Sequence, residues 1–533
     1  MKIILNTQYN WETKQKGQMI VHSIGNTRAF EPVCDYLDSV DHPDRSRIAE
    51  LLSEQVGNFA AIIEGRGYVL AFVDTIRSYP LFYTQGSADP VVSNSARTAK
   101  SDCMLDAISE LSLLEFNMSG YVTGGETIYK DLYQLQAGEM LFWDRAGSRL
   151  ERKRYYRYYP REIERKNEAE YIDELTAVID RIFQRVIDNA DGAPIWVPLS
   201  GGLDSRLIVC KLKEFGCNNL FTFSYGPPGN YEAKIAKRVA SRLGVPWVFM
   251  PSLSSKARDF FRSGVRKDFW DFSDGLCAVP NMQDLEPLLS LREQGRLPGD
   301  AVMVNGQSGD FITGGHVPES LLHEGADEPR LFDAVIAKHF SLWEHLKTET
   351  YLDRIQGKIG KLLNEACEGD VSGSVPELYE YWEWQERQCK YVVHGQRVYD
   401  YMNLSWQLPL WDYEYMRFWQ TVPMQYKSKQ KLYRAFLEKY DYKGLFRNFH
   451  PVVWRWPGSS IAVVPVARFA QVLFGKACKE RIYQYAKYFG HYSNQYAAYG
   501  YKHYLRHIHN ARNIVSFYVM TWQSENGISN GLQ

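Results

Sequence analysis

The sequence has no excess of charge of either sign. Its 62 Lys and Arg residues are matched by 63 Asp and Glu residues, so its overall electrostatics give no reason to expect nucleic acid or an anionic membrane as the main partner. Local basic pockets are compatible with this balance. The composition therefore leaves small-molecule chemistry as open as any other function.

The sequence also lacks paired cysteines. Its eight cysteines are scattered, none lies in a CxxC pair, and no histidines follow at zinc-finger spacing. This absence argues against a disulfide framework and against a structural zinc site. The reducing cytoplasm is therefore the compartment that we expect.

Long hydrophobic runs are missing as well. Residues 1–13 contain too short an apolar segment for a secretory signal. The most apolar late stretch, residues 461–475, contains Pro465 and Arg468 and is shorter than the roughly 20 residues that cross a bilayer. We expect no membrane span, and we interpret this stretch as a buried or surface-docked helix.

The sequence does have material for more than one packed core, because 45% of its 533 residues are hydrophobic and 14% are aromatic. Its first part is predicted to be sheet-rich, with short strands between Gly, Asp and Ser clusters. An amphipathic helix follows, with apolar residues three and four apart from Leu175 to Val186. We place a domain boundary before it, giving domains 1–155 and 168–533. The predicted strands are 59–63, 68–73, 80–84, 90–93 and 140–144.

From residue 194 onward, strands alternate with helices. This alternation predicts an α/β domain with a doubly wound parallel sheet and ligands at the carboxyl ends of its strands. Beyond residue 319 the pattern is mainly helical. The predicted elements are strands 195–199, 220–224, 247–250 and 301–305 and helices 205–215 and 231–243.

The sharpest local signal is the hexapeptide SGGLDS, which runs from Ser200 to Ser205. Gly201 and Gly202 let the backbone approach a ligand, while free amides at the start of the following helix favour an anion. Ser200 and Ser205 add hydroxyl donors. Asp204 suits phosphate only if Mg²⁺ bridges them. We therefore predict a pyrophosphate site with Mg²⁺; the plainer alternative is a strand-to-helix turn with a serine or aspartate cap.

SGGLDS matches the pyrophosphate-binding loop of the PP-loop ATPases, and its setting resembles the asparagine synthetase family. Residues 221–226, FTFSYG, are similar to the second strand of that family, whose backbone meets adenine. The resemblance implies that ATP binds on this loop and strand. It adds Ser224, Tyr225 and Gly226 to the nucleotide contacts.

Residues 305–316, NGQSGDFITGGH, align with the family segment SGEGADELFGGY. The alignment implies a nucleotide contact at Gly306 and a second magnesium ligand at Asp310. Gln307 and Phe311 stand where the family usually has glutamates, which argues against amide chemistry on the family's usual substrate.

A third segment, LPLWD at residues 408–412, resembles the family's PFLD element. It is followed by Lys427, Lys429, Lys431 and Arg434, which are similar to the family's lysine-arginine motif. In the family this lysine stabilises negative charge on the reacting phosphate, as a fixed cation does. We predict Lys431 as the catalytic lysine and Lys429 as the second candidate; a solvated cluster is the alternative.

The N-terminal segments 57–60, GNFA, and 79–83, YPLFY, resemble class II glutamine amidotransferase domains, which have an Ntn-hydrolase-like α+β fold. Those enzymes attack glutamine with a cysteine that is the mature N-terminal residue. Here Lys2 holds the second position and the first cysteine is the internal Cys34. We therefore expect no glutamine hydrolysis by this chain. Nitrogen would come from ammonia, from an amine on the substrate, or from a separate glutaminase.

Together these resemblances imply an AMP-forming ligase that uses ATP and Mg²⁺ to adenylate a small-molecule carboxylate and then form an amide. Divergent members with this element pattern resemble enzymes of bacterial surface-polysaccharide synthesis, including lipopolysaccharide, which points to a uronic acid sugar as the substrate. Two alternatives stay open: ring closure within one substrate, as in β-lactam synthetase, and a non-catalytic nucleotide-binding scaffold. A homodimer is also open.

Overall fold

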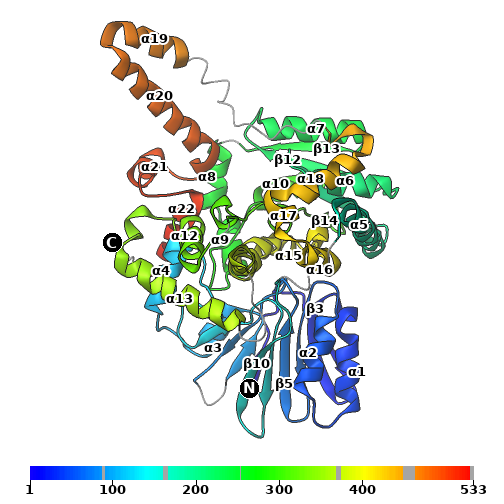
Figure 1. Cartoon of the computed structure of the whole chain (residues 1–533). Coiled ribbons are helices and arrows are strands. Elements are labelled where there is room, and N and C mark those ends of the chain that lie inside the picture. Colours follow the sequence, from blue (N-terminus) through cyan, green and yellow to red (C-terminus); the bar gives the residue numbers. More distant parts are fainter. Residues whose placement is uncertain are drawn as a thin grey trace.

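The computed structural model describes residues 1–86, 90–159, 166–252, 254–323, 325–367, 374–447 and 463–528. These residues form an α/β structure with three sheets. Figure 1 shows two of the sheets in the N-terminal part, at one end of the molecule, and the third sheet in the other half. The carboxyl ends of this third sheet hold the site described below.

The N-terminal part contains a six-stranded antiparallel sheet and a four-stranded sheet, in the orders β10-β9-β5-β4-β3-β2 and β1-β7-β6-β8. In β4, Ala61 and Ile63 pack with α1 and α2, whereas Ala60 and Ile62 face the main core, because successive side chains of a strand point to opposite faces. Both faces of this sheet are therefore buried. The elements are β1 (Lys2–Ile4), β2 (Glu12–Lys16), β3 (Met19–Gly25), α1 (Glu31–Ser39), α2 (Arg45–Ser53), β4 (Phe59–Glu64), β5 (Tyr68–Val73), β6 (Phe82–Thr84), β7 (Val91–Ser93), α3 (Ala96–Asp102), α4 (Glu110–Ser119), β8 (Leu132–Gln134), β9 (Glu139–Asp144) and β10 (Arg149–Arg154).

The five strands predicted for this part are present as β4, β5, β6, β7 and β9. The prediction missed β1, β2, β3, β8 and β10. Strands β2 and β10 have the sequences ETKQK and RLERKR and leave most of their side chains exposed or half-buried at the sheet edges. They carry no hydrophobic alternation that could reveal them.

The third sheet is parallel throughout and has the order β13-β12-β11-β14-β15. The chain builds one side from β11 to β13 and then returns to the other side with β14, so the strand order reverses between β11 and β14. Loops that leave two such strands diverge and open a crevice at their carboxyl ends, where α/β sheets bind ligands. The strands are β11 (Ile195–Pro198), β12 (Leu220–Gly226), β13 (Trp247–Pro251), β14 (Val302–Val304) and β15 (Ser405–Gln407).

Three helices accompany this sheet: α5 (Glu168–Ala190), α6 (Asp204–Glu214) and α7 (Tyr231–Leu243). Helices α6 and α7 begin and end within one residue of their predictions, whereas α5 extends beyond the apolar pattern of residues 175–186 at both ends. Helix α7 coincides with its prediction because both of its ends carry strong local signals. Asn230 accepts a hydrogen bond from the Ala233 N–H at 2.7 Å, and Gly244 ends the helix with a left-handed backbone. Helix α5 begins with a reciprocal capping box between Asn167 and Glu170.

Beyond residue 319 the described chain is mainly helical, as predicted. Strand β15 was not predicted, because three residues carry too little pattern. The further helices are α8 (Ser254–Arg262), α9 (Gly264–Ser273), α10 (Leu285–Glu293), α11 (Gly309–Ile312), α12 (Glu328–His339), α13 (Glu349–Cys367), α14 (Val375–Trp382), the π-helix η4 (Glu383–Val392), α15 (Arg397–Tyr401), α16 (Tyr413–Thr421), α17 (Met424–Lys427), α18 (Lys431–Tyr440), α19 (Val463–Phe474), α20 (Lys476–His491), the π-helix η10 (Tyr492–Tyr496), α21 (Tyr501–His507) and α22 (Ile514–Glu525).

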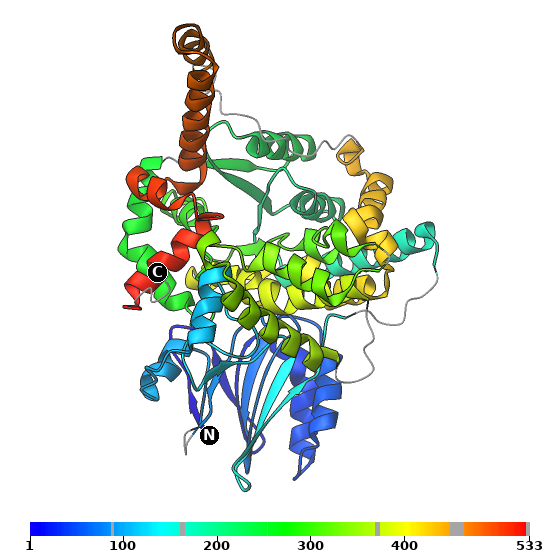
Figure 2. The same ribbon diagram turned by 60° about the vertical axis from the view of Figure 1, so that its left-hand side comes forward.

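Helices α19 and α20 form a hairpin that projects from the body of the molecule (Figures 1 and 2). Helix α19 coincides with the apolar stretch predicted at 461–475, whose first two residues lie outside the described residues. Of the two predicted alternatives the buried helix is wrong, because the large apolar side chains of α19 are exposed, and the surface-docked helix stays a prediction. Within the described ranges no helix is both long and apolar enough to cross a membrane.

Buried charges join the N-terminal sheets to the other half of the molecule. The ammonium of Lys390, on η4, is buried and donates to the carbonyl oxygen of Val122 at 3.2 Å and to that of Gly124. Glu386, one turn earlier, accepts from the Gly124 N–H at 2.8 Å and pairs with Lys390. Both charges belong to η4 and pair with each other, while their remaining hydrogen bonds hold the backbone of Val122 and Gly124 in the N-terminal part. Moving η4 away would leave these buried backbone groups without partners.

A second buried ion pair fixes the segment that carries the predicted lysines. Lys427, at the end of α17, bonds to Glu380 of α14 at 2.6 Å, and both side chains are buried. Burial raises the pKa of Glu380, and the ammonium of Lys427 opposes that shift. Lys427 is therefore a structural residue in this fold.

Replacing Lys427 by Met should destabilise the protein by about 3–5 kcal/mol, because it strands the buried Glu380 carboxylate. Lys429→Met is the matched control. Its partner Glu319 lies at 2.9 Å, but both side chains are about two-thirds exposed, and exposed pairs of this kind contribute little to stability. Differential scanning calorimetry of the two variants measures the difference. Equal effects would contradict the structural role.

Candidate functional site

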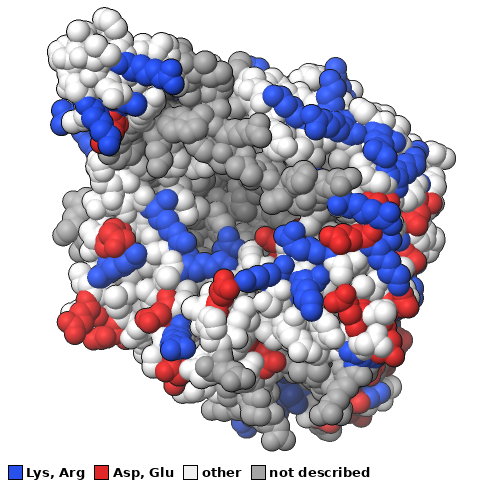
Figure 3. Space-filling view, turned by 45° about the horizontal axis from the view of Figure 1, so that its top comes forward, with Lys and Arg blue, Asp and Glu red and all other residues white. Residues whose placement is uncertain are grey.

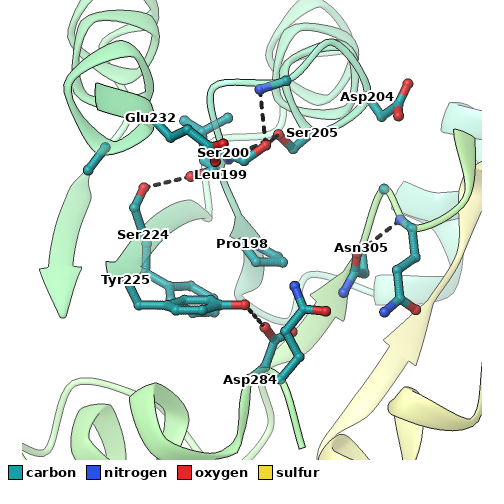
Figure 4. A pocket seen from close by; sticks show the side chains of 16 residues that line it. Pro198, Leu199, Ser200, Asp204, Ser205, Ser224, Tyr225, Glu232, Asp284 and Asn305 are labelled. Atoms are coloured by element: carbon teal, nitrogen blue, oxygen red, sulfur yellow. Dashed lines mark hydrogen bonds between the residues drawn. The ribbon is translucent and has the colours of Figure 1, made fainter. Parts of the chain in front are cut away.

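A cavity of about 310 Å³ lies at the carboxyl ends of β11, β12 and β14 (Figure 4). It sits at the point where the strand order reverses. Most of the residues predicted to bind the nucleotide line this cavity: Ser200, Gly202, Asp204, Ser205, Ser224, Tyr225 and Gly306. The other lining residues are Pro198, Leu199, Phe223, Glu232, Ala233, Gln283, Asp284, Asn305 and Gln307.

Two predicted nucleotide contacts lie elsewhere. Gly201 faces α7, since a Cβ added there would meet Cα of Glu232 at 3.2 Å. Its absence of a side chain lets the loop and α7 approach each other. Gly226 lines a neighbouring cavity of about 520 Å³, which shares Tyr225 and Gln283 with the first.

The turn between β11 and α6 is held by its own serines. Ser205 Oγ accepts from the Ser200 N–H at 3.1 Å and lies 3.1 Å from Ser200 Oγ, which in turn accepts from the Gly202 N–H at 3.1 Å. These bonds fold the turn over the start of α6, which begins at Asp204. The first amides of a helix lack intrahelical partners, so this end of the cavity favours an anion.

Asp204 projects from the start of α6 to one side of the cavity (Figure 4). Its Oδ1 accepts from the hydroxyl of Tyr433 at 2.8 Å. The loop after β14 lies directly against it, because a Cβ added to Gly309 would come within 2.6 Å of the Asp204 Cγ atom. Burial, and next the nearby charge of Asp310, raise the pKa of Asp204 to about 7.

Asp310 is exposed and is held by a chain of polar groups that ends at the buried Glu383. Its Oδ2 lies 3.0 Å from Nε2 of His316, whose Nδ1 lies 2.6 Å from Oε1 of Glu383. Glu383 is fully buried and also pairs with Lys338 at 2.9 Å. Burial alone would lower the pKa of His316, but its bonds to the two carboxylates raise that pKa to about 9. The imidazolium therefore fixes the orientation of Asp310.

The pair Asp204 and Asp310 fits Mg²⁺ bound to a phosphate. Among the residues that the structure describes, no group of three or more His, Cys, Asp and Glu side chains is placed to hold a metal. Mg²⁺ commonly takes one or two carboxylates and completes its shell with water and substrate phosphates, so two are enough. The raised pKa of Asp204 marks a carboxylate whose charge has too little compensation in the protein alone.

The opposite wall of the cavity contains an acid that the sequence did not reveal. Asp284 is buried and accepts from the hydroxyls of Tyr225 and Tyr399, each at 2.6 Å. Tyr399 also accepts from the amide of Asn305 at 2.9 Å. Burial raises the pKa of Asp284, and the two tyrosine hydroxyls oppose the shift. Asp284 belongs to no strand-end motif, so only the fold brings it here. Glu383 was missed for the same reason, whereas His316 lies within the aligned segment 305–316 but was given no role there.

The two predicted catalytic lysines do not line the cavity. Lys431 is the first residue of α18, is mostly exposed, and lies 3.8 Å from Glu168. Lys429 pairs with Glu319 at the surface. Helix α18 nevertheless approaches the site, because Tyr433, two residues after Lys431, bonds to Asp204.

The two departures from the family segment have different surroundings. Gln307 lines the cavity and accepts from the side-chain amide of Gln396 at 2.5 Å. Phe311 is buried and packs against the rings of Tyr158 and Trp411. Position 311 is thus part of the core in this chain, and of the two positions only 307 faces the cavity.

The first cysteine does not have the surroundings of a nucleophile. Cys34 lies on α1 and is buried between that helix and the six-stranded sheet. Burial raises the pKa of its thiol to about 11, whereas a reactive cysteine needs a lowered pKa and access to substrate.

The family model named asparagine synthase matches residues 188–454, which is half of the chain. This chain belongs to the asparagine synthase family. The matched range contains the β11–α6 turn, Asp204, Asp310 and the predicted lysines. Family membership indicates an ATP-dependent ligase that forms an amide.

Other comparisons give weaker similarity. No curated protein sequence matches the chain. Among solved structures, glutamine phosphoribosylpyrophosphate amidotransferase from B. subtilis, complexed with ADP and GMP, is 12% identical and has a TM-score of 0.20, over 46% of this chain and 73% of that one. The NH3-dependent NAD synthetase from Campylobacter jejuni is also 12% identical, with a TM-score of 0.21, over 40% and 92%.

The raised pKa of Asp204 predicts how the nucleotide-free protein responds to pH. A carboxyl whose pKa is higher in the folded state than the usual 3.8 penalises folding increasingly as pH rises from there to about 7. Without Mg²⁺ and ATP, Asp204→Asn should therefore raise the Tm, and raise it more at pH 8 than at pH 5. Thermal denaturation at both pH values measures this.

The exposed Asp300, at the opposite end of β14, supplies the control variant Asp300→Asn. Its Tm should follow that of the unmodified protein at both pH values. A lower Tm for Asp204→Asn at pH 8 would contradict the assignment of uncompensated charge to Asp204.

Proposed function

We propose that this protein adenylates a small-molecule carboxylate with ATP and then converts it to an amide, with release of pyrophosphate and AMP. The observation that carries the proposal is the contact between the β11–α6 turn and the loop after β14, which brings Asp204 and Asp310 together beside an anion-binding helix start. Both of these features suit a nucleoside triphosphate that binds with Mg²⁺.

The reaction has two balanced steps. A carboxylate oxygen of the substrate attacks the α-phosphorus of ATP, and the bond between the α-phosphorus and the bridging oxygen breaks as pyrophosphate leaves. The nitrogen of ammonia then attacks the acyl carbon, AMP leaves with the former carboxylate oxygen, and the nitrogen loses a proton. Ser200 and Ser205, which line the cavity, and the first amides of α6 would donate hydrogen bonds to the leaving pyrophosphate.

Asp204 and Asp310 would hold Mg²⁺, which when bound neutralises charge on the phosphates. Tyr433 and His316 orient the two carboxylates, each from an element outside the turn. Lys431 is the proposed cation that stabilises the reacting phosphate, with Lys429 as the second candidate. Both lie near the start of α18, whose Tyr433 already contacts the site.

For the substrate we propose a uronic acid sugar of bacterial surface-polysaccharide synthesis. Asn305, Gln307 and Gln283 line the cavity, and side-chain amides both donate to and accept from hydroxyl groups. These three amides are the groups of the cavity that suit the hydroxyls of such a sugar.

For the N-terminal sheets we propose an Ntn-hydrolase-like glutaminase fold, with residues 1–155 as one domain and 168–533 as the other. The buried Cys34, with its raised pKa, supports a domain that has kept its structure without its nucleophile. Nitrogen would then come from free ammonia or from a separate glutaminase.

The proposed chemistry predicts that AMP and amide form from ATP and nucleotide-linked uronic acids only when ammonium is present. Asp204→Ala should lower kcat/KM by about 10²–10³-fold, the usual effect of losing one electrostatic contact to the transition state. AMP release, pyrophosphate exchange and product mass measure these outcomes. Asp300→Ala, at the far end of the same sheet, is the control.

Product formation without ammonium would favour ring closure within one substrate. ATP binding with background pyrophosphate exchange across a broad panel of acids would favour a non-catalytic nucleotide-binding protein. Either result would overturn the proposed amide synthesis.

The hydrogen bonds that link Glu383, His316 and Asp310 predict an effect on the Mg²⁺ dependence of the activity. Because His316 orients a proposed metal ligand, His316→Gln should raise the Mg²⁺ concentration for half-maximal activity by about 10–100-fold, while kcat at saturating Mg²⁺ changes less. Glu383→Gln should act in the same direction. A Mg²⁺ titration of the AMP-forming activity measures the shift.

Lys338→Gln is the matched control, because Lys338 bonds to Glu383 but makes no hydrogen bond to Asp310. It should lower the Tm without moving the Mg²⁺ dependence. If all three variants lose stability equally and leave the Mg²⁺ midpoint unchanged, the hydrogen bonds from Glu383 through His316 to Asp310 have a structural role only.

A further inference from the structure

The outer helix of the projecting hairpin exposes large apolar side chains. We call α19 and α20, residues 463–491, the arm. Phe469, Val472 and Phe474 are 67%, 83% and 72% exposed, and Val466 and Leu473 are more than half exposed. Elsewhere in the described chain, large exposed hydrophobic residues are isolated, as Met104 is. Exposed single residues are ordinary, but a contiguous set marks an interaction site.

In α19 the large apolar side chains face solvent, whereas a helix that packs into a core directs them inward. Its buried residues are the small Ala467 and Ala470, which face the neighbouring helix. Val466, Phe469 and Leu473, three and four residues apart, form the outward face. An amphipathic helix normally buries its large apolar face. The outward face of α19 is therefore shaped to contact something outside this chain.

The charge of the arm indicates what that contact is. The chain as a whole is balanced, but the arm contains five Lys and Arg residues and one acidic residue, Glu480. Arg468 and Lys476 are exposed next to the apolar face. Figure 3 shows Lys and Arg side chains of the arm beside uncharged surface. An apolar face flanked by Lys and Arg is the pattern of a helix that lies in the surface of an anionic bilayer.

The geometry of the arm agrees with this partner. Helix α19 has 12 residues, about 18 Å at 1.5 Å per residue, which is too short to cross a hydrocarbon core of about 30 Å. It stands away from the body, so its outward face can reach a flat surface (Figures 1 and 2). Two copies meeting through this face would bring like charges together, which disfavours a symmetric dimer here.

We propose that the arm binds the surface of an anionic lipid bilayer, with Val466, Phe469 and Leu473 inserted below the headgroups. Arg468 and Lys476 then lie at the level of the lipid phosphates. Attraction between the arm and the anionic surface adds to the burial of the apolar face. This inference depends on α19 and α20 and is independent of the amide chemistry proposed above.

Sedimentation with lipid vesicles tests the proposal on the full chain. The protein should sediment with vesicles of phosphatidylcholine that contain phosphatidylglycerol, more than with phosphatidylcholine alone, and less as salt is added. Phe469→Ser combined with Leu473→Ser should lower the partition coefficient by at least about tenfold, because two buried apolar side chains are lost. Arg468→Ser and Lys476→Ser should each lower it about fivefold on anionic vesicles only.

Met104→Ser is the control, because Met104 is 83% exposed and lies in the N-terminal part. It should leave vesicle binding unchanged. The proposal is overturned if the unmodified protein does not sediment with anionic vesicles. It is also overturned if the variant with both Phe469→Ser and Leu473→Ser binds these vesicles as well as the unmodified protein. A lipid-free dimer in analytical ultracentrifugation that the double variant dissociates would instead assign the face to a second copy. ATP binding and circular dichroism verify that each variant is folded.

Discussion

Two glycines after β14 set the distance on which the rest of the site depends. A Cβ at Gly306 would lie 3.1 Å from the backbone nitrogen of Ser205, and one at Gly309 would lie 2.6 Å from Cγ of Asp204. The loop therefore rests on the start of α6 with no room for a side chain. This contact places Asp310 beside Asp204, although the two are far apart in the sequence, because β11 and β14 are neighbours in the parallel sheet.

The close approach also explains why only part of the site could be predicted from the sequence. The turn at Ser200 and the caps of α7 are local signals, which a short stretch of sequence carries completely. The surroundings of Asp204 are not local, since Tyr433 comes from α18 and Gly309 from the loop after β14. Asp284 has no motif at all. Phe311 shows a different limit of the sequence. The alignment assigns position 311 to the motif, but it cannot reveal that the side chain packs among aromatic rings.

The same reasoning applies to the N-terminal sheets, where β4, β5 and β9 were predictable because buried runs are apolar, while the charged edge strands β2 and β10 were not. Strand β3 was missed although its burial alternates along the strand. What holds this part in place is a set of buried ion pairs. Besides Lys390 with Glu386, Lys358 of α13 bonds to the buried Glu115 of α4 at 2.6 Å. Removing one partner of such a pair costs more than the pair contributes to stability. The contacts of the N-terminal part therefore contribute to the stability of the rest of the described structure.

Overall charge balance, finally, is an average that conceals opposite local environments. At physiological ionic strength charges are screened within about 8 Å, so groups at distant ends of the molecule do not offset each other. The site places two carboxylates, Asp204 and Asp310, side by side, whereas the arm has Arg468 on α19 and four further Lys and Arg residues on α20. Figure 1 shows the arm in the same half as the third sheet, with the N-terminal sheets at the other end. A bilayer bound to the arm would therefore lie on the side of the ATP-binding half, and the N-terminal sheets would point away from it.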